Sequence, residues 1–113
     1  MRIAIPVSDN SDNPDLSLRF GRSPYFAIIS ENPKQHLIIE NPFLNYTTGI
    51  GKALKELLIN KYKIEMFVAY ELGLKIQEIA SKKNIQLVII NTKNKTLEEL
   101  KKLLIKRYSL IQS

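Results

Sequence analysis

Residues 64–90 have the sequence IEMFVAYELGLKIQEIASKKNIQLVII, in which two apolar runs flank a helical pattern. The run at 64–69 is apolar apart from Glu65, and a second apolar run covers 85–90. Such runs are typical of strands in a parallel sheet that is buried on both faces. Between them, the apolar residues at helical spacing are Leu72, Ile76, Ile79 and Ala80. The stretch therefore predicts a β-α-β unit with a buried parallel pair of strands.

Three further strands are expected before this unit. Residues 2–7 alternate and are rich in β-branched side chains, and the polar, turn-forming segment at 8–15 ends that strand. Residues 25–29 and 36–40 are two more strand patterns, separated by the short segment at 30–34. Because so short a connection favours an antiparallel hairpin, the sheet is expected to be mixed.

Two more helices complete the pattern. The first is expected at 49–61, where the residues at helical spacing are Ile50, Ala53, Leu54, Leu57 and Leu58. Thr96 and Glu99 have the spacing of a capping box at the start of the closing helix. The apolar face of that helix consists of Leu97, Leu100, Leu103, Leu104 and Tyr108. We expect the helix to fray beyond Arg107.

The resulting order is β-β-β-α-β-α-β-α. It predicts a single α/β domain at 1–108, with a mixed five-stranded sheet covered by three helices, followed by a C-terminal tail at 109–113. Right-handed crossovers leave loops at the carboxyl ends of the strands, where ligands bind in α/β folds. The loops concerned are those at 9–22, 41–51 and 70–73.

The composition restricts the chemistry of the chain. Its 113 residues suit one domain, and 44% hydrophobic with 25% charged residues is ordinary for a globular protein. The absence of cysteine excludes disulfides, thiolate nucleophiles and clusters held by thiolates of this chain. His36, the only histidine, is expected on a strand facing solvent or a partner. One imidazole cannot by itself supply a catalytic triad or a zinc site.

The net charge of +6 suits a nucleic acid, a membrane surface or a small anion. Most lysines are nevertheless expected on solvated helix faces, namely Lys52, Lys55, Lys75, Lys82, Lys83, Lys101, Lys102 and Lys106. The first residues lack the apolar core of a signal peptide, and no apolar run of about 18 residues occurs. We therefore expect a cytoplasmic protein without a membrane span.

The segment SLRFGRSPYF at 17–26 is the strongest candidate for a site. A glycine between Arg19 and Arg22 permits a left-handed backbone or a close approach to a ligand, and two guanidinium groups nearby can bind an anion bidentately. The alternative is a loop that closes the sheet, with Phe20 and Phe26 in the core and both arginines solvated. Both interpretations stay open for the glycine and the aromatic residues.

Two weaker signals lie at predicted helix starts. Gly49-Ile50-Gly51 would present backbone N–H groups to an anion, or would simply form a flexible helix entry. Glu71, just before Gly73, could act as a general base or stabilise the start of the next helix electrostatically, and the second role is favoured. The acids at positions 9, 12 and 15 lack the spacing of a calcium-binding loop.

The motifs RFGRSPYF at 19–26, Glu40-Asn41-Pro42, Gly49-Ile50-Gly51 and Gly73 together resemble the dinitrogenase iron–molybdenum cofactor biosynthesis family. The resemblance covers about residues 1–107. It implies a ribonuclease H-like, three-layer fold and a non-enzymatic role in binding, carrying or inserting nitrogenase cofactor or its iron–sulfur precursors. It also implies that an iron–sulfur or iron–molybdenum type cluster is held transiently, with cluster donor or acceptor proteins as partners.

Two departures from the family pattern concern metal ligands. Arg19 stands where family members commonly have a histidine, and Thr47 and Thr48 stand where many have another. Arginine can still hold an anionic cluster by charge and hydrogen bonds from outside its coordination shell. We therefore predict no metal ligands in the chain. The predicted ligand-binding residues are Arg19, Phe20, Gly21, Arg22, Thr48, Gly49, Gly51, Glu71 and Gly73.

Three hypotheses follow, in decreasing order of support. The first is a binding or carrier protein for an anionic metal cluster or a related small anion, present as a monomer or weak homodimer. The second is a protein-interaction or scaffold domain that has lost its metal ligands. The third is nucleic-acid binding, whose catalytic form needs carboxylates at strand ends, and only Glu40 and Glu71 are candidates for that role.

Overall fold

The central element of the structure is β1 (Ile3–Val7), which has a neighbour on each side in a five-stranded sheet. The computed structural model describes residues 1–30 and 35–108. The other strands are β2 (Tyr25–Ile29), β3 (Leu37–Glu40), β4 (Met66–Ala69) and β5 (Gln86–Ile89), and the order across the sheet is β3-β2-β1-β4-β5. β2 pairs antiparallel with β1 and β3, whereas β4 pairs parallel with β1 and β5. The predicted hairpin and the mixed sheet are both confirmed.

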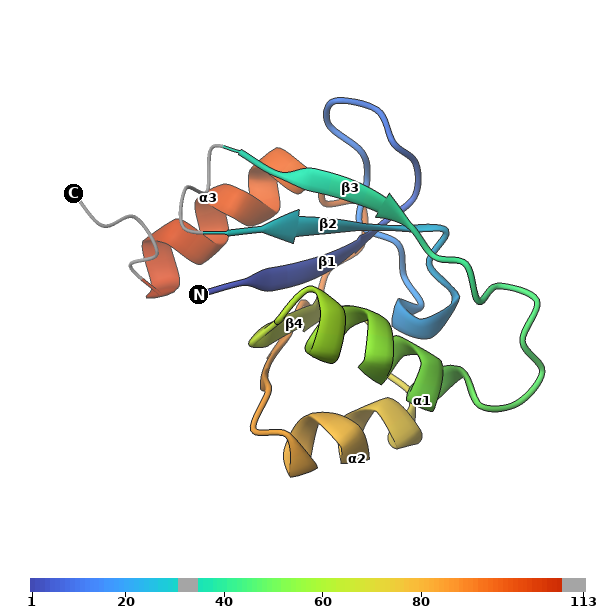
Figure 1. Cartoon of the computed structure of the whole chain (residues 1–113). Coiled ribbons are helices and arrows are strands. Elements are labelled where there is room, and N and C mark those ends of the chain that lie inside the picture. Colours follow the sequence, from blue (N-terminus) through green and yellow to red (C-terminus); the bar gives the residue numbers. More distant parts are fainter. Residues whose placement is uncertain (31–34, 109–113) are drawn as a thin grey trace.

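Helices cover both faces of this sheet (Figure 1). They are α3 (Leu97–Tyr108) on one face, and α1 (Ile50–Leu54), its continuation η2 (Lys55–Lys61) and α2 (Leu74–Lys82) on the other. Within the described residues, none of these helices has the length and hydropathy of a membrane span. The predicted three-layer, ribonuclease H-like α/β fold with three helices is confirmed. The predicted tail at 109–113 and most of the predicted hairpin turn lie outside the described residues.

Three phenylalanines fill the layer between the sheet and the pair α1 and α2. Phe20 comes from the 3-10 turn η1 (Phe20–Arg22), and its ring centroid lies 5.2 Å from that of Phe26 and 4.8 Å from that of Phe67. All three rings are buried. Because burying such a side chain contributes roughly 1.5–3 kcal/mol, the three are a large part of this core. The interpretation of Phe20 and Phe26 as core residues is confirmed.

The helix predicted at 49–61 changes its pitch halfway. Ile50–Leu54 is α-helical, whereas Lys55–Lys61 forms wider π-helical turns. The N–H of Tyr62 accordingly donates to the carbonyl of Leu57, five residues earlier, at 3.1 Å. The predicted extent is confirmed to within one residue, but the apolar spacing gave no sign of the change in pitch.

The strand predicted at 85–90 forms, but the prediction that it is buried is only half right. β4 is buried at every position, and Val88 and Ile90 of the second strand are buried beneath α3. Leu87 and Ile89, however, are 36% and 55% exposed. The reason is that β5 lies at the edge of the sheet, with β4 as its one neighbour, where the helical layer leaves the side chains on one face partly uncovered.

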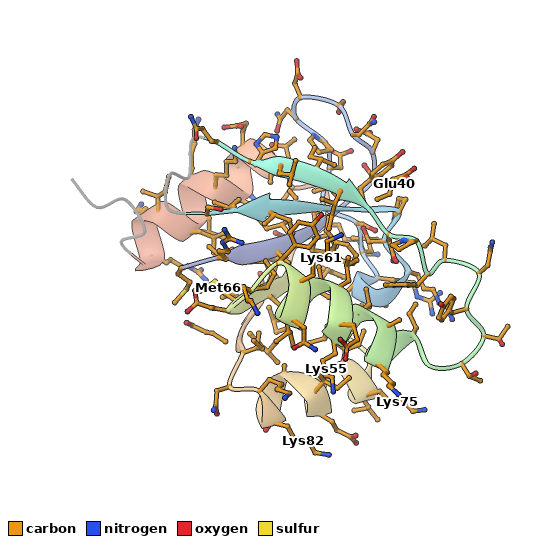
Figure 2. All side chains as sticks on the ribbon, in the orientation of Figure 1. Glu40, Lys55, Lys61, Met66, Lys75 and Lys82 are labelled. Atoms are coloured by element: carbon orange, nitrogen blue, oxygen red, sulfur yellow. The ribbon has the colours of Figure 1, made fainter. Side chains whose placement is uncertain are left out.

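The lysine prediction is correct for most positions. Figure 2 shows Lys55, Lys75 and Lys82 projecting from the layer of α1, η2 and α2. Of the predicted positions, those exposed are Lys52, Lys75, Lys82, Lys83, Lys102 and Lys106, and Lys55 is half-buried. The last of the eight, Lys101, contradicts the prediction, because its side chain is only 3% exposed.

Lys101 is buried because it lies on the inner face of α3, one helical turn from both Leu97 and Leu104. Its ammonium Nζ is 2.6 Å from Nδ1 of His36 and 3.4 Å from a carboxylate oxygen of Glu98. His36, expected to face solvent or a partner, is therefore half-buried against α3. Burial, and then the positive charge of Lys101, lower the pKa of His36 below its usual 6.5.

The loop after β1 fixes the start of α3. The N–H of Glu98 donates to the side-chain oxygen of Asn13 at 2.9 Å, and the N–H of Leu97 donates to the carbonyl of Pro14 at 2.8 Å. Thr96 and Glu99 each accept a hydrogen bond from the other's backbone N–H, at 3.2 and 3.1 Å. The predicted capping box is confirmed, and the acidic loop serves as a support for this helix end.

Candidate functional site

Two loops meet where β1 and β4 end. The chain returns from the β1 loop so that Arg19 and Glu71 form a short parallel bridge. The N–H of Phe20 donates to the carbonyl of Glu71 at 3.1 Å, and the N–H of Glu71 donates to the carbonyl of Leu18 at 3.0 Å. Main-chain hydrogen bonds thus hold the arginine segment against the turn that precedes α2, as expected for loops at the carboxyl ends of strands.

A pocket of about 300 Å³ opens between these loops. Its lining consists of Arg19, Phe20, Gly21, Arg22, Ile50, Glu71, Leu72, Gly73 and Ile76. Six of the nine predicted ligand-binding residues therefore share one cavity, namely Arg19, Phe20, Gly21, Arg22, Glu71 and Gly73. The other three, Thr48, Gly49 and Gly51, are not part of this lining.

The two arginines of the pocket differ in their partners. A terminal nitrogen of Arg22 donates to the carbonyls of Leu44 and Tyr46, at 3.2 and 2.8 Å, and so anchors the loop after β3. Arg19 is exposed, and its guanidinium makes no hydrogen bond or ion pair with any residue that the structure describes. Arg22 thus has a structural task, whereas all the donors of Arg19 can turn to a ligand.

Asn41 is the residue that connects these loops, a role that was not predicted from the sequence. Its side-chain amide donates to the carbonyl of Ser23 at 2.9 Å and to that of Gly21 at 3.2 Å, and its oxygen accepts from the N–H of Phe43 at 3.0 Å. Asn41 and Ser23 are both buried. An asparagine followed by proline after a predicted strand was the only signal for this clamp, and that signal indicates no more than a turn.

The glycines predicted at the start of α1 serve the fold. Gly49 precedes the helix with φ of 76°, in the left-handed region that side chains disfavour. Gly51 lies on the face of α1 that contacts α2, where an added Cβ would be 3.2 Å from Cδ1 of Ile79. Gly51 therefore permits close packing of the two helices. Thr48 is exposed in the loop that leads to Gly49.

The start of α2 forms one wall of the pocket. Gly73 is the N-cap, and no side chain caps the helix there. The first N–H groups of a helix lack partners within the helix, and the positive end of its dipole favours a negative charge. Glu71 is exposed on the same rim and does not cap α2 by a hydrogen bond. Its carboxylate is the one negative group of the lining, beside two guanidinium groups.

The pocket does not fit a metal that needs ligands from the protein. The sequence has no cysteine, and among residues 1–30 and 35–108 no group of three or more His, Asp or Glu could hold a metal ion. His36 precedes β3, whose far end, Glu40, pairs with Tyr25 near the pocket. The only imidazole therefore lies at the opposite end of the sheet, against Lys101. The donors that the pocket offers, guanidinium and backbone N–H groups, suit an anion that carries its own ligands.

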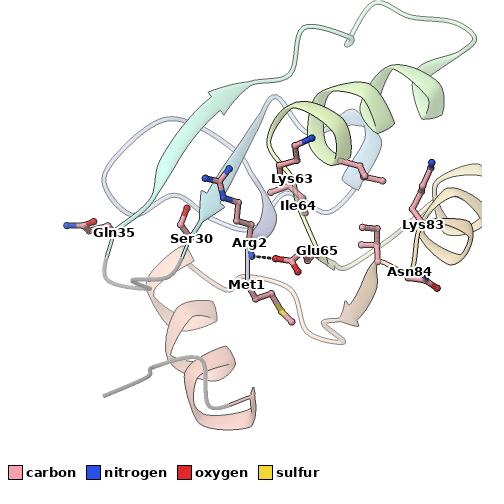
Figure 3. Close-up of a pocket in the computed structure, with 11 residues that line it drawn as sticks. Met1, Arg2, Ser30, Gln35, Lys63, Ile64, Glu65, Lys83 and Asn84 are labelled. Carbon is pink, nitrogen blue, oxygen red and sulfur yellow. Dashed lines mark hydrogen bonds between the residues drawn. The ribbon is translucent and has the colours of Figure 1, made fainter.

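A larger hollow of about 980 Å³ lies at the other end of the molecule (Figure 3). Arg2, Lys63 and Lys83 give it positive charge. Arg2 already has local partners, since its main-chain N–H donates to Glu65 at 3.2 Å and its guanidinium donates to the carbonyl of Tyr62 at 2.8 Å. This hollow also lies where η2 and α2 end, and the negative end of a helix dipole disfavours an anion.

Solved structures share the fold of this chain. The protein PH0822 has 24% sequence identity and a TM-score of 0.73, covering 97% of this chain and 97% of that chain. The apo form of the orange protein from Desulfovibrio gigas has 16% identity and a TM-score of 0.82, covering 93% and 87%. A Thermotoga protein provisionally called a NifB protein has 19% identity and a TM-score of 0.69, covering 95% and 88%.

The family assignment comes from the sequence itself. No curated protein sequence matches the chain. The family model described as dinitrogenase iron–molybdenum cofactor matches residues 1–107, which is nearly the whole chain. The resemblance found in its motifs is thereby confirmed, and the chain belongs to the dinitrogenase iron–molybdenum cofactor family.

Proposed function

We propose that this protein is a non-enzymatic carrier that holds a small anion in the pocket between Arg19 and the start of α2. The cargo is an anionic metal cluster, of the iron–sulfur or iron–molybdenum type, or a related anion. One observation carries the proposal: the guanidinium of Arg19 has no partner among the described residues and lines a pocket beside an uncapped helix start. The family to which the chain belongs supports a cluster as the cargo.

Binding in this pocket would be reversible, because it uses hydrogen bonds and charge. Arg19 and Arg22 supply positive charge, and the N–H groups at the start of α2 supply further donors. The carboxylate of Glu71 opposes a bound anion and so keeps the affinity moderate. A cluster that keeps all its own ligands can then pass between donor and acceptor proteins.

The pocket also lacks the groups that catalysis would need. Glu71 is its only acid and has no histidine, cysteine or second carboxylate among the lining residues. Nucleophilic catalysis needs a base placed beside a nucleophile, and this lining holds no such pair. This supports a carrier over an enzyme.

The first test uses tetrathiomolybdate, a coloured molybdenum–sulfur anion, added to the isotopically labelled protein in a nuclear magnetic resonance titration. We expect saturable shifts of the backbone amides of Arg19 and Gly73, which line the pocket, and of Leu74, the first residue of α2. Shifts confined to Arg2 and Lys63, or none at all, would refute the site.

The scaffold hypothesis has its own supporting observation, which is the absence of metal donors from the pocket. Protein purified without oxygen from a host that makes metal clusters distinguishes the two functions. A carrier is expected to retain iron or molybdenum with sulfide and a visible absorption band. A colourless protein free of metal, which also fails to bind tetrathiomolybdate, would favour the scaffold.

A further inference from the structure

The outer edge of β5 is short, with four residues, but carries no charge or proline of its own. Proteins prevent edge pairing with charged side chains, proline, bulges or a covering element. Residues 85–92, IQLVIINT, contain no charge and no proline. β5 has β4 as its single neighbour in the sheet. In its sequence and in the order of the strands that the structure describes, the stretch can therefore accept another strand.

The main chain of β5 presents its free groups at two residues. The N–H of Gln86 donates to Glu65 and that of Ile90 donates to Ala69, at 2.9 and 2.8 Å, so these alternate residues bond toward β4. Main-chain groups alternate in direction along a strand. Leu87 and Ile89, at the alternate positions, therefore direct their N–H and C=O groups toward the open edge. Their side chains are also 36% and 55% exposed. A strand added here would gain main-chain hydrogen bonds and would cover both side chains.

Lysines flank the edge at both ends. Lys82 and Lys83 precede β5, and Lys93 follows it. All three are exposed, and no ion pair joins them to a residue in the described part of the chain. Lys93 is held over the ring of Tyr70, with Nζ 5.8 Å from the ring centroid. The edge is thus neutral and apolar in the middle and positive at its ends.

This charge pattern disfavours the two-fold pairing with a second copy in which Leu87 and Ile89 of both copies bond to one another. In an antiparallel pair of β5 strands, the register that joins Leu87 to Ile89 of the other copy brings Lys83 toward Lys93 of that copy. The two-fold symmetry repeats the same like-charge contact at the other end. Like charges brought face to face between strands are destabilising.

We infer that the β5 edge binds an extended segment of a partner protein, one with a β-branched, apolar centre and acidic residues on both sides. Main-chain hydrogen bonds to Leu87 and Ile89 would supply the affinity, as in other cases of strand addition. Pairing with Lys83 and Lys93 would supply the selectivity. The inference does not depend on an anion in the Arg19 pocket.

The test uses two synthetic peptides with the same centre of alternating valine and threonine, one flanked by aspartates and the other by lysines. Each is titrated into the labelled full-length protein. The acidic peptide is expected to shift the amides of Leu87 and Ile89 and to bind at least about tenfold more tightly than the basic one at low salt.

Variants make the test specific. Ile89→Pro removes an N–H that faces the open edge, where proline is tolerated. Should that variant fail to fold, Leu87→Glu adds a protecting charge that also repels the acidic peptide. Either is expected to abolish binding. Reversing both Lys83 and Lys93 to glutamate should transfer the preference to the basic peptide, whereas Lys102→Glu on α3 should leave it unchanged.

Three results would overturn the inference. They are failure of both peptides to bind, equal binding of the two, and a dimer in sedimentation that Leu87→Glu dissociates. The last would show that the edge pairs with a second copy. Tetrathiomolybdate binding in the same samples reports the Arg19 pocket separately, so the two proposals can fail independently.

Discussion

Replacing Asn41 with alanine should destabilise the fold and disturb the pocket together. The substitution removes hydrogen bonds of 2.9, 3.0 and 3.2 Å that join this residue to Ser23, Phe43 and Gly21. Each contributes about 1 kcal/mol net, and a buried carbonyl left without a donor costs at least as much. Ser23 is fully buried. We therefore expect a loss of roughly 3 kcal/mol in the free energy of unfolding.

The assay is unfolding in urea followed by circular dichroism, in which the midpoint should fall while the dependence on urea stays constant. Asn45→Ala is the matched control, since Asn45 is exposed in the same loop and should change stability by less than about 0.5 kcal/mol. The affinity for tetrathiomolybdate should also fall for Asn41→Ala. Asn41 donates to the carbonyl of Gly21, which belongs to the Phe20–Arg22 turn that lines the pocket. A loss below about 1 kcal/mol would refute the role of the clamp.

Two further substitutions test the fold. Gly49→Ala should cost about 1 kcal/mol in unfolding free energy because φ is 76°, and Gly49→Asn should cost less than half as much; equal losses would contradict the strain argument. The pKa of His36 in the folded protein is below 6.5. As the pH falls past 6.5, the unfolded chain therefore takes up the proton more readily than the folded protein does. Stability should therefore decline as the pH falls through 6.5 and below, and His36→Gln, which keeps an acceptor for Lys101, should flatten this decline. An unchanged pH profile would show that the contact does not matter.

The fold followed from local patterns that each strand and helix carries in its own residues. The alternation at 2–7, the short connection at 30–34 and the apolar run at 64–69 were sufficient for the mixed sheet. The position of β5 at the edge was not predictable in this way. An apolar run indicates a strand but does not say which strands lie on either side, and the exposure of Leu87 and Ile89 depends on that order.

Lys101 could have been recognised as buried. It follows Leu97 by four residues and precedes Leu104 by three, which places it within the apolar stripe of the closing helix. The partner that makes this burial tolerable, His36, lies 65 residues away, and no local pattern connects the two. The burial of Lys101 was therefore predictable from the sequence, whereas its contact with His36 was not.

The candidate site was predicted in part for the same reasons. The sequence placed Arg19 and Glu71 in loops at strand ends, but it did not predict that they meet. They meet because β1 and β4 are parallel neighbours. The carbonyl partners of Arg22 leave no trace in the sequence, because every residue has a carbonyl. Gly51 matched a pattern for anion binding, yet its neighbour is α2, and only the packing of the helices reveals this.

The affinity of tetrathiomolybdate for Arg19→Ala, set against that for Arg107→Ala, tests the central claim most directly. Arg107 is an exposed arginine on α3, on the other side of the sheet from the pocket helices. Calorimetry should show binding about tenfold weaker for Arg19→Ala, or ~1.4 kcal/mol, and unchanged for Arg107→Ala. Equal affinity of both variants and the unmodified protein would contradict an anion site at Arg19.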